Sequence, residues 1–421
     1  MNLIQRPLRF CFITTFYPPF HFGGDAVFVY RLGHELARRG HQVEVIHCVD
    51  SYYALGGKQP SETYDEHPKI TVHGLKSGWG VLSPLTTFET GIPFFQRRRI
   101  RQILGAGFDV IHFHNVSLVG GPKVLEYGHA IKLYTPHEYW LACPTHMLFR
   151  FNRRPCPEDG SCLACTLFHR RPPQWWRYSG RLERAAKHVD AFLSLTQFIE
   201  EIHQRRGLSL PFVRLEPFLP AAADETDADE PSRDAAKGGA KSPPPPYFLY
   251  VGRLEKLKGL QTLIPLFRHY ARAQLWVAGA GNYEAPLRRL AEDSPNIHFL
   301  GRRTYRELHS LYRNAVAVIV PSLFYEIAPL VILEAACHGT PVLGRNLGGI
   351  RELVAGRAGL VYDTESELLA ALERLCLDPA WRDELGRRGR ATWQERWTPE
   401  AHVNRYLSVI ADLAAQRGIA F

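Results

Sequence analysis

The chain has 421 residues, of which 45% are hydrophobic and 22% are charged, and its formal net charge is +9. These values are ordinary for a water-soluble globular protein, and they exclude a disordered, a collagen-like and a disulfide-rich miniprotein class. No stretch approaches the ~18 apolar residues of a membrane span and no export signal is recognisable, so a cytoplasmic enzyme or binding protein is expected. The positive charge favours an anionic partner, for which nucleic acid, a phosphorylated small molecule and an anionic membrane are the candidates.

The first half of the chain alternates strand and helix patterns. RFCFITTF (9–16) is typical of a buried strand, and a loop with Gly23 and Gly24 follows it. Apolar residues at helical spacing then continue to Gly40, and VEVIHCV (43–49) is the next strand, which completes a strand–helix–strand unit. The two glycines before the helix would let the backbone approach a phosphate closely, and a simple loop turn is the alternative.

Three histidines fall within or just after predicted strand ends. The runs DVIHFHN and LYTPHEYW contain His112, His114 and His137. A histidine at the end of a strand can act as a general acid or base, or it can bind an oxygen atom of a ligand. For any one of them taken alone, a packed structural histidine is the commoner case.

A compositional break separates the two halves. Residues 221–246 contain no aromatic and no β-branched aliphatic side chain and end in four prolines, which predicts a flexible linker with a stiffer proline end. The expected domains are therefore 1–220 and 247–397. The last segment, 398–421, is predicted to be a helix that starts at a Thr-Pro cap, and it can pack back on the N-terminal domain.

The second half repeats the strand–helix alternation more cleanly. Six short strand-like runs, from YFLYVG to GLVYD, are each followed by a helical segment of ten or so residues. This alternation favours a parallel, doubly wound sheet. The predicted fold class is α/β, with two Rossmann-like domains that face a cleft.

Basic and glycine-rich residues follow two of these strands. In VGRLEKLKGL, Arg253 and Lys258 come after the first strand, where an arginine can hold phosphate with two hydrogen bonds and a lysine adds a point charge. Gly279 ends another strand in WVAGAG. A solvated basic loop is the alternative interpretation of the first motif, and a single G-x-G is weak evidence.

Two glutamates flank a predicted helix start in FYEIAPLVILEAACHG. Proline is favoured in the first helical turn, so the helix is expected to begin near Ala328 or Pro329. Glu326 then lies on the preceding loop and Glu334 lies inside the helix. The amides of Leu330 and Val331 would face an anion, with one carboxylate on each side to bind the hydroxyls of a sugar and of a ribose. Two surface glutamates near a helix start are the alternative.

Taken together, these motifs resemble those of the retaining GT-B glycosyltransferases, specifically glycosyltransferase family 4. The resemblance is carried by EIAPLVILE, GRLEKLKG, the GAG run, FLGRRTYRELHSLYRNAVAVIVPS and HGTPVLGRNLGGIRELV, all within 247–365. The N-terminal half is similar more loosely, through the diglycine loop, DVIHFHN and the TPH run.

The resemblance implies a nucleotide-diphosphate sugar as donor and a glycan or a lipid-linked molecule as acceptor, as in cell-envelope polysaccharide synthesis. It implies that Arg253 and Lys258 hold the diphosphate, that Glu326 contacts the donor sugar and Glu334 the ribose. It also implies that Gly24 approaches the diphosphate and that His137 lies near the transferred sugar. No metal is expected at the diphosphate.

Two alternatives stay open from the sequence. One is a related enzyme, a GT-B phosphorylase or a sugar-nucleotide epimerase. The other is a basic nucleic-acid-binding protein with a cysteine metal module, which would bind its partner with a steep salt dependence.

The segment WWRYSGRLERAAKH (175–188) combines two tryptophans with four cationic side chains. Basic amphipathic segments of this kind lie at the surface of anionic membranes, and family members that build lipid-linked glycans often dock in this way. Peripheral contact with the inner face of a membrane is one expectation. An ordinary solvated helix with its aromatic side chains packed inward is the other.

Four cysteines fall close together at the spacing C-x(12)-C-x(5)-C-x(2)-C. The last pair has the two-residue gap that lets two thiolates bind one ion, and two further cysteines lie nearby, which predicts a structural zinc site. An iron–sulfur cluster, a labile disulfide and unliganded thiols are the alternatives. Some members of the resembled family carry a similar insertion after an H-x-Y-W run, here about 141–175. The four residues are Cys143, Cys156, Cys162 and Cys165.

Overall fold

The structure is a computed structural model that describes residues 6–156, 162–220 and 245–421. The chain divides into two units, Met1–Glu216 with Pro399–Phe421, and Pro217–Thr398. The predicted linker 221–246 lies outside the described residues except for its last two prolines.

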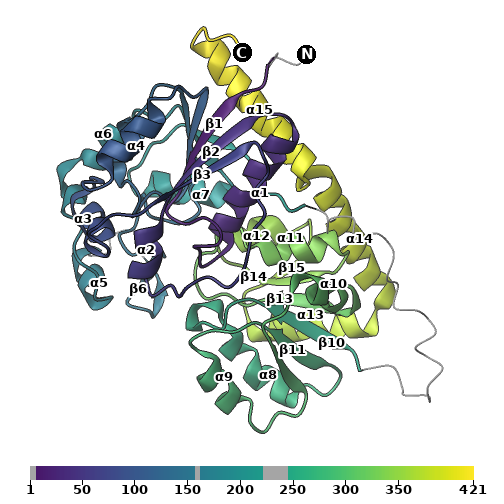
Figure 1. Cartoon of the computed structure of the whole chain (residues 1–421). Helices are drawn as coiled ribbons and strands as arrows, with labels where there is room; N and C mark the ends of the chain where they lie inside the picture. Colours follow the sequence, from purple (N-terminus) through teal and green to yellow (C-terminus); the bar gives the residue numbers. More distant parts are fainter. Residues whose placement is uncertain (1–5, 157–161, 221–244) are drawn as a thin grey trace. The chain divides into compact units, whose positions relative to one another are not determined.

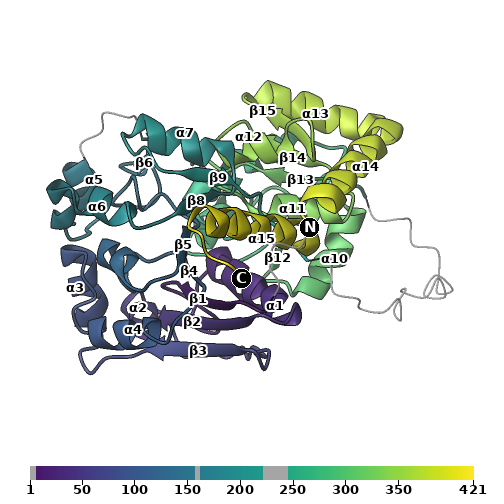
Figure 2. The same ribbon diagram turned by 90° about the horizontal axis from the view of Figure 1, so that it is seen from above.

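The N-terminal unit is built on a parallel sheet of seven strands in the order β3-β2-β1-β4-β5-β8-β9 (Figures 1 and 2). In β1 four of the five side chains are buried, as expected for a parallel sheet that is covered on both faces. The predicted strand 9–16 is longer than the observed one, because the chain leaves the sheet at Thr14. The strands are β1 (Arg9–Ile13), β2 (Gln42–Cys48), β3 (Ile70–Leu75), β4 (Val110–Phe113), β5 (Ile131–Tyr134), β8 (Ala191–Ser194) and β9 (Phe212–Arg214).

Helices connect these strands, and a two-stranded hairpin lies outside the main sheet. The hairpin strands are β6 (Phe149–Arg150) and β7 (Arg154–Pro155). The helices are α1 (Gly24–Arg38), α2 (Val49–Ala54), α3 (Leu82–Thr90), α4 (Arg97–Leu104), η1 (Pro122–Glu126), α5 (Cys162–Phe168), η2 (Trp175–Ser179), α6 (Arg181–Ala186), α7 (Gln197–Arg205) and α15 (Pro399–Gln416).

The last helix, α15, packs against α1 and β5 of the N-terminal unit (Figures 1 and 2). Tyr406 on α15 is fully buried, and its hydroxyl lies 3.0 Å from Nδ1 of His112. Nδ1 of His402, on the same helix, lies 2.7 Å from the carbonyl oxygen of Glu216. The end of the chain is thereby part of the core of the first unit.

The second unit has a parallel sheet of six strands in the order β12-β11-β10-β13-β14-β15. Alternate side chains of β10 enter different hydrophobic clusters, Phe248 and Tyr250 one, Tyr247 and Leu249 the other, so both faces of the sheet are covered. The predicted class, α/β with two doubly wound parallel sheets, is confirmed. The strands are β10 (Tyr247–Val251), β11 (Gln274–Ala278), β12 (Ile297–Gly301), β13 (Ala317–Val320), β14 (Val342–Arg345) and β15 (Gly359–Tyr362).

The helices of the second unit cover both faces of its sheet and continue to the boundary with α15. They are η4 (Lys256–Lys258), η5 (Leu260–Thr262), α8 (Ile264–His269), α9 (Glu284–Leu290), α10 (Tyr305–Asn314), α11 (Leu330–Cys337), α12 (Gly349–Val354), α13 (Glu365–Leu377) and α14 (Pro379–Arg396). Within the described residues, no helix is both long and apolar enough to span a membrane.

Buried histidines make the N-terminal unit sensitive to acid. Burial lowers the pKa of His47, His203 and His402 to about 4, so between about pH 6.5 and pH 4 the unfolded chain binds protons that the folded chain does not. We expect the free energy of unfolding to be highest above about pH 6.5 and to fall as the pH falls toward 4. Urea unfolding at a series of pH values measures this slope. The variant His47→Phe should show a shallower slope, and an unchanged slope would contradict the role given to His47.

Candidate functional site

The strand order of the second sheet reverses between β10 and β13, and this position organises the candidate donor site. Strands β10 and β13 are neighbours although two further strands separate them in the sequence. The connections that leave their carboxyl ends run to opposite sides, and ligands of open α/β sheets bind at such a point. The predicted residues Arg253 and Lys258 follow β10, and Glu326 follows β13.

A lysine and a glutamate from these two loops form an ion pair. Nζ of Lys258 lies 2.6 Å from Oε1 of Glu326, and the hydroxyl of Ser322 donates to the same oxygen at 2.6 Å. The side chain of Glu326 is only 10% exposed and that of Lys258 is 21% exposed. The structure therefore brings a cation and a carboxylate together at the switch point, as the sequence motifs suggested but could not show.

Arg253 lies on the same loop as Lys258 and is exposed. Its carbonyl oxygen accepts a hydrogen bond from the hydroxyl of Tyr250 at 2.9 Å, which fixes the backbone after β10. Its guanidinium group lies 2.9 Å from Oε1 of Glu255. An exposed guanidinium group on a fixed loop can reach a phosphate without first leaving a buried position.

Helix α11 begins at Leu330, with Pro329 in an extended conformation before it and no side chain capping its first amides. Glu326 thus precedes the helix and Glu334 lies inside it, in agreement with the position of the proline. The amides of Leu330 and Val331 are among the first-turn groups that have no partner within the helix, and such groups bind anions.

A buried tyrosine orients Glu334. The hydroxyl of Tyr312, on α10, donates to Oε2 of Glu334 at 2.6 Å. The Tyr312 side chain is 1% exposed, and burial together with the neighbouring Glu334 raises its pKa well above the ordinary value. Tyr312 therefore stays a hydrogen-bond donor at neutral pH, and it holds one carboxylate oxygen of Glu334 in place.

Two glycines permit the close packing of the loops around this site. Gly279 has φ +147°, and a Cβ atom there would lie 1.9 Å from the carbonyl oxygen of Gly252. A Cβ atom on Gly349 would lie 1.8 Å from the carbonyl oxygen of Ile327, and the amide of Gly349 donates to the carbonyl oxygen of Glu326 at 2.8 Å. The start of α12 thereby fixes the loop that carries Glu326.

The N-terminal sheet has its own reversal, between β1 and β4. Gly23 is the extended residue before α1, and Gly24 is the first residue of that helix and is exposed. A Cβ atom on Gly23 would meet nothing closer than Oδ1 of Asp25, at 4.0 Å. The open surroundings of Gly23 and the exposure of Gly24 agree with a backbone that a ligand can approach.

The three predicted histidines lie together, but they differ in what they can do. His112 is buried, with one ring nitrogen 3.0 Å from the hydroxyl of Tyr406 and the other 2.8 Å from Oγ1 of Thr135. Both nitrogens are engaged within the fold, so His112 has no unpartnered ring nitrogen for a ligand. His114 is fully buried, and its Nδ1 lies 3.0 Å from Nε2 of His137.

His137 is the member of this group that is partly exposed. Burial lowers its pKa to about 4, an effect that Asp25 partly offsets, so the imidazole is neutral at pH 7. Of the two roles expected for it, binding an oxygen atom fits a neutral ring better than general acid catalysis. Nε2 of His114 is buried without a partner, which favours a proton on its Nδ1 and a hydrogen bond from there to His137.

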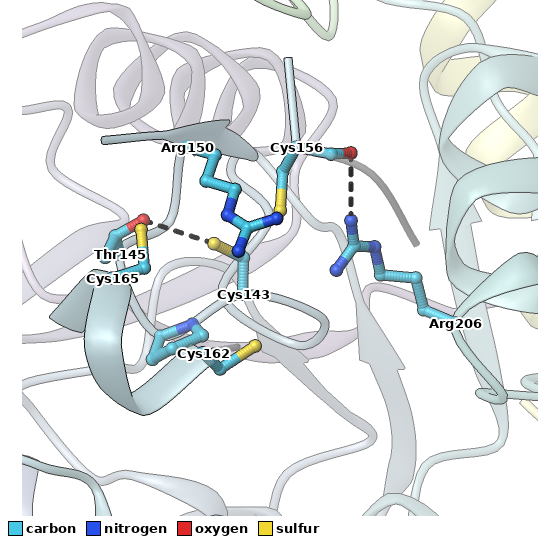
Figure 3. Close-up of a pocket in the computed structure, with 8 residues that line it drawn as sticks. Cys143, Thr145, Arg150, Cys156, Cys162, Cys165 and Arg206 are labelled. Atoms are coloured by element: carbon cyan, nitrogen blue, oxygen red, sulfur yellow. Dashed lines mark hydrogen bonds between the residues drawn. The ribbon is translucent and has the colours of Figure 1, made fainter. Parts of the chain in front are cut away.

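The four predicted cysteines line one pocket, together with Thr145, Arg150 and Arg206 (Figure 3). None of the four forms a disulfide in the described part of the chain, and Sγ of Cys143 lies 3.2 Å from Oγ1 of Thr145. As the side chains are placed, no group of three histidine, cysteine or acidic residues within the described part of the chain could hold one metal ion.

The segment 175–188, for which membrane contact and inward packing were the two expectations, is not one continuous helix. Gly180, with φ +63°, separates η2 from α6. Trp176 is buried and its indole donates to the carbonyl oxygen of Phe88 at 2.9 Å, while Arg177 packs on its ring. Trp175, at 62% exposed, is the tryptophan of the pair that faces solvent.

Sequence reasoning missed Tyr312 and Ser322, which orient the two glutamates, and Gly349, which fixes the Glu326 loop. Gly349 belongs to a diglycine before a helical pattern, and that signal could have identified it. Tyr312 and Ser322 carry no comparable signal, because their partners lie in other elements.

Comparison with known proteins assigns the chain to a family. The family model for Glycosyltransferase Family 4 matches residues 22–213, and that for Glycosyl transferases group 1 matches residues 232–392. The chain is 27% identical, over 87% of its length and 84% of the relative, to D-inositol 3-phosphate glycosyltransferase of Pseudarthrobacter chlorophenolicus.

Solved structures agree at the level of the fold. Sucrose-phosphate synthase from Thermosynechococcus elongatus superposes with a TM-score of 0.71 at 19% identity, covering 97% of this chain and all of that one. HepE of Anabaena in complex with UDP-glucose superposes with a TM-score of 0.62 at 15% identity, covering 96% and 99%. The chain belongs to the group 1, family 4 glycosyltransferases, and it is an enzyme of the GT-B fold class.

Proposed function

We propose that this enzyme transfers a sugar from a nucleoside-diphosphate donor to a hydroxyl group of a glycan or lipid-linked acceptor, with retention of the anomeric configuration. The observation that carries the proposal is the Lys258–Glu326 pair at the switch point, where Glu326 lies four positions before the helix start at Leu330. UDP-glucose bound to the related HepE fold supports a sugar nucleotide as donor. The family assignment does not favour the nucleic-acid-binding alternative.

Each group of the donor has a counterpart in the second unit. Arg253, Lys258 and the first amides of α11 supply positive charge for the diphosphate, so the chain itself can neutralise the leaving group. Glu326 accepts hydrogen bonds from sugar hydroxyls. Glu334, oriented by Tyr312, accepts them from the ribose.

In the N-terminal unit, His137 binds an oxygen atom at the reacting end of the sugar. Its neutral ring can donate from Nδ1 when Nε2 is engaged by His114. His114 is then a positioning residue, because it acts through His137. The proposal of retention comes from the family resemblance. NMR of the product tests it, because the spectrum gives the anomeric configuration. The same spectrum identifies the product and so distinguishes sugar transfer from the phosphorylase and epimerase alternatives.

A lipid-linked acceptor fits an exposed aromatic and basic patch on the N-terminal unit, made of Trp79, Phe94, Arg97, Arg98 and Arg99. Trp79 is 60% exposed and Phe94 is 71% exposed, and both rings contact that of Phe95. The three arginines are exposed in the first turn of α4. Aromatic rings beside a cluster of arginines favour the interface of an anionic membrane.

The first prediction concerns the donor site. We expect Glu334→Ala and Arg253→Ala each to weaken UDP binding by about 10- to 150-fold, because a charged hydrogen bond of about 1.5–3 kcal/mol is lost. Calorimetric titration with UDP, GDP and ADP measures the change. Glu373→Ala and Arg272→Ala are matched controls, since this exposed pair lies in the same unit at 2.9 Å. If both variants fold and bind the nucleotide with unchanged affinity, the proposed donor site is contradicted.

The second prediction concerns His137. His137→Ala should lower kcat at least about tenfold and leave nucleotide affinity nearly unchanged, because its contact with the reacting sugar matters most in the transition state. Since its pKa is about 4, the wild-type profile should show no inflection from this residue between pH 6 and 8. If His114→Ala is inactive while His137→Ala is active, the assignment is wrong.

The third prediction concerns the patch. The wild-type protein should float with vesicles that contain phosphatidylglycerol and not with vesicles of phosphatidylcholine alone. Trp79→Ser and Phe94→Ser should reduce flotation, because each loses an exposed aromatic ring. Leu377→Ser is the control, since Leu377 is 63% exposed in the other unit. If the protein floats with neither kind of vesicle, membrane docking is contradicted and a free glycan remains as the acceptor, and equal flotation with both kinds contradicts the role of the arginines.

A further inference from the structure

The segment that carries the four cysteines has little hydrophobic core of its own. Its regular elements are the two-residue strands β6 and β7 and the seven-residue helix α5. The main hydrophobic cluster of the N-terminal unit takes Trp140 and Leu141 before the segment and Trp176 after it, and none of the described residues between them. Segments this short usually need a disulfide or a metal ion to hold one conformation.

The backbone of this segment is also strained. Among the described residues, every non-glycine residue with a positive φ lies here. Leu148 and Phe151, with φ of 48° and 51°, are bulky side chains for which this conformation is unfavourable. Such strain of about 1–3 kcal/mol per residue persists only where other interactions fix the backbone. The five residues are His146, Leu148, Phe151, Asn152 and Arg170.

The cysteines come to one pocket from three separate parts of the segment. Cys143 lies in the loop after β5, Cys156 directly follows β7, and Cys162 and Cys165 lie on one face of α5, three residues apart (Figure 3). The other cysteines of the chain lie elsewhere, two of them in β1 and β2 of the sheet and two in the second unit. The convergence therefore follows from the fold of this segment.

The charges around the pocket favour bound anionic sulfur. Among the described residues, the ionisable side chains that line it, besides the thiols, are Arg150 and Arg206. Arg177 lies near enough to interact with Cys143 and Cys162, and with the carboxylate of Glu138. Four thiolates around a divalent ion carry a net charge of about −2, which the guanidinium groups of Arg150 and Arg206 can offset.

We propose that Cys143, Cys156, Cys162 and Cys165 bind one structural zinc ion as four thiolates. Binding releases the four thiol protons as four sulfur–zinc bonds form, and no redox change takes place. The sulfur atoms do not surround one point in the structure, since Cys143 is turned toward Thr145, so side-chain rotation accompanies binding. The residues fit zinc by donor type, number and surrounding charge.

The zinc ion fixes the loop that carries His137. The amide of Cys143 donates to the carbonyl oxygen of Tyr139 at 2.7 Å, and the amide of Tyr139 donates to the carbonyl oxygen of His146 at 3.2 Å. A clamp at Cys143 therefore holds the turn that directly follows His137. This inference does not depend on the proposed donor or acceptor, because the ion is structural.

The experiment is metal analysis of the full-length protein, purified under reducing conditions without chelator. We expect about one zinc ion per chain, released by a mercurial reagent as the four thiols are modified. Cys162→Ser should lower the zinc content at least about fivefold and speed proteolytic cleavage within 141–175. Cys376→Ser is the matched control, since Cys376 is a partly exposed thiol outside the pocket, and it should keep its zinc.

Should Cys162→Ser fail to fold, the wild-type protein stripped by chelator at neutral pH serves instead. It should regain protection from proteolysis on addition of zinc and not of magnesium. Iron with acid-labile sulfide, two disulfides detected by mass, or a metal-free protein that is equally protected would each overturn the proposal.

Discussion

The site depends on one constraint, the reversal of strand order in a parallel sheet. Parallel strands cannot be joined by tight turns, so each needs a crossover, and crossovers on either side of the reversal run to opposite faces. Between β10 and β13 this leaves the carboxyl ends of two strands without a covering connection. The loops that carry Lys258 and Glu326 leave the sheet at these ends, and their side chains meet there although 68 positions separate them in the chain.

The ion pair at this position also limits what the site can bind. A carboxylate that is 10% exposed is costly unless it is paired, and Lys258 together with Ser322 supplies the partners. A ligand whose phosphate binds Lys258 breaks the ion pair, so the ligand must also donate hydrogen bonds to Glu326. A sugar that carries hydroxyl groups next to a phosphate meets both requirements, and a simple phosphate meets only one. The pair therefore favours a sugar phosphate over a free anion.

Local signals predicted the parts of the fold and site that depend on neighbouring residues. Pro329 placed Glu326 before α11 and Glu334 inside it, and the strand–helix alternation gave both sheets. Contacts between distant elements could not be found in this way. The indole of Trp176 donates a hydrogen bond to the carbonyl oxygen of Phe88, far away in the chain, and sequence alone could not decide between this packing and an exposed face. The contact of His112 with Tyr406, 294 residues further along the chain, was likewise not visible from the sequence.

The N-terminal unit contains two kinds of buried polar group, the histidines and the cysteines. The histidines are neutral because burial opposes a charge, and a neutral ring suits hydrogen bonding to sugar oxygens. Burial raises the pKa of Cys162 as well, as do the neighbouring Cys143 and Cys156, whereas Arg206 and Arg177 lower it. A thiol such as Cys162, whose pKa is raised, stays protonated at neutral pH unless a cation stabilises its thiolate. In the proposed zinc site the metal ion would be that cation, so the histidines of this unit exclude charge whereas the cysteine pocket would compensate it.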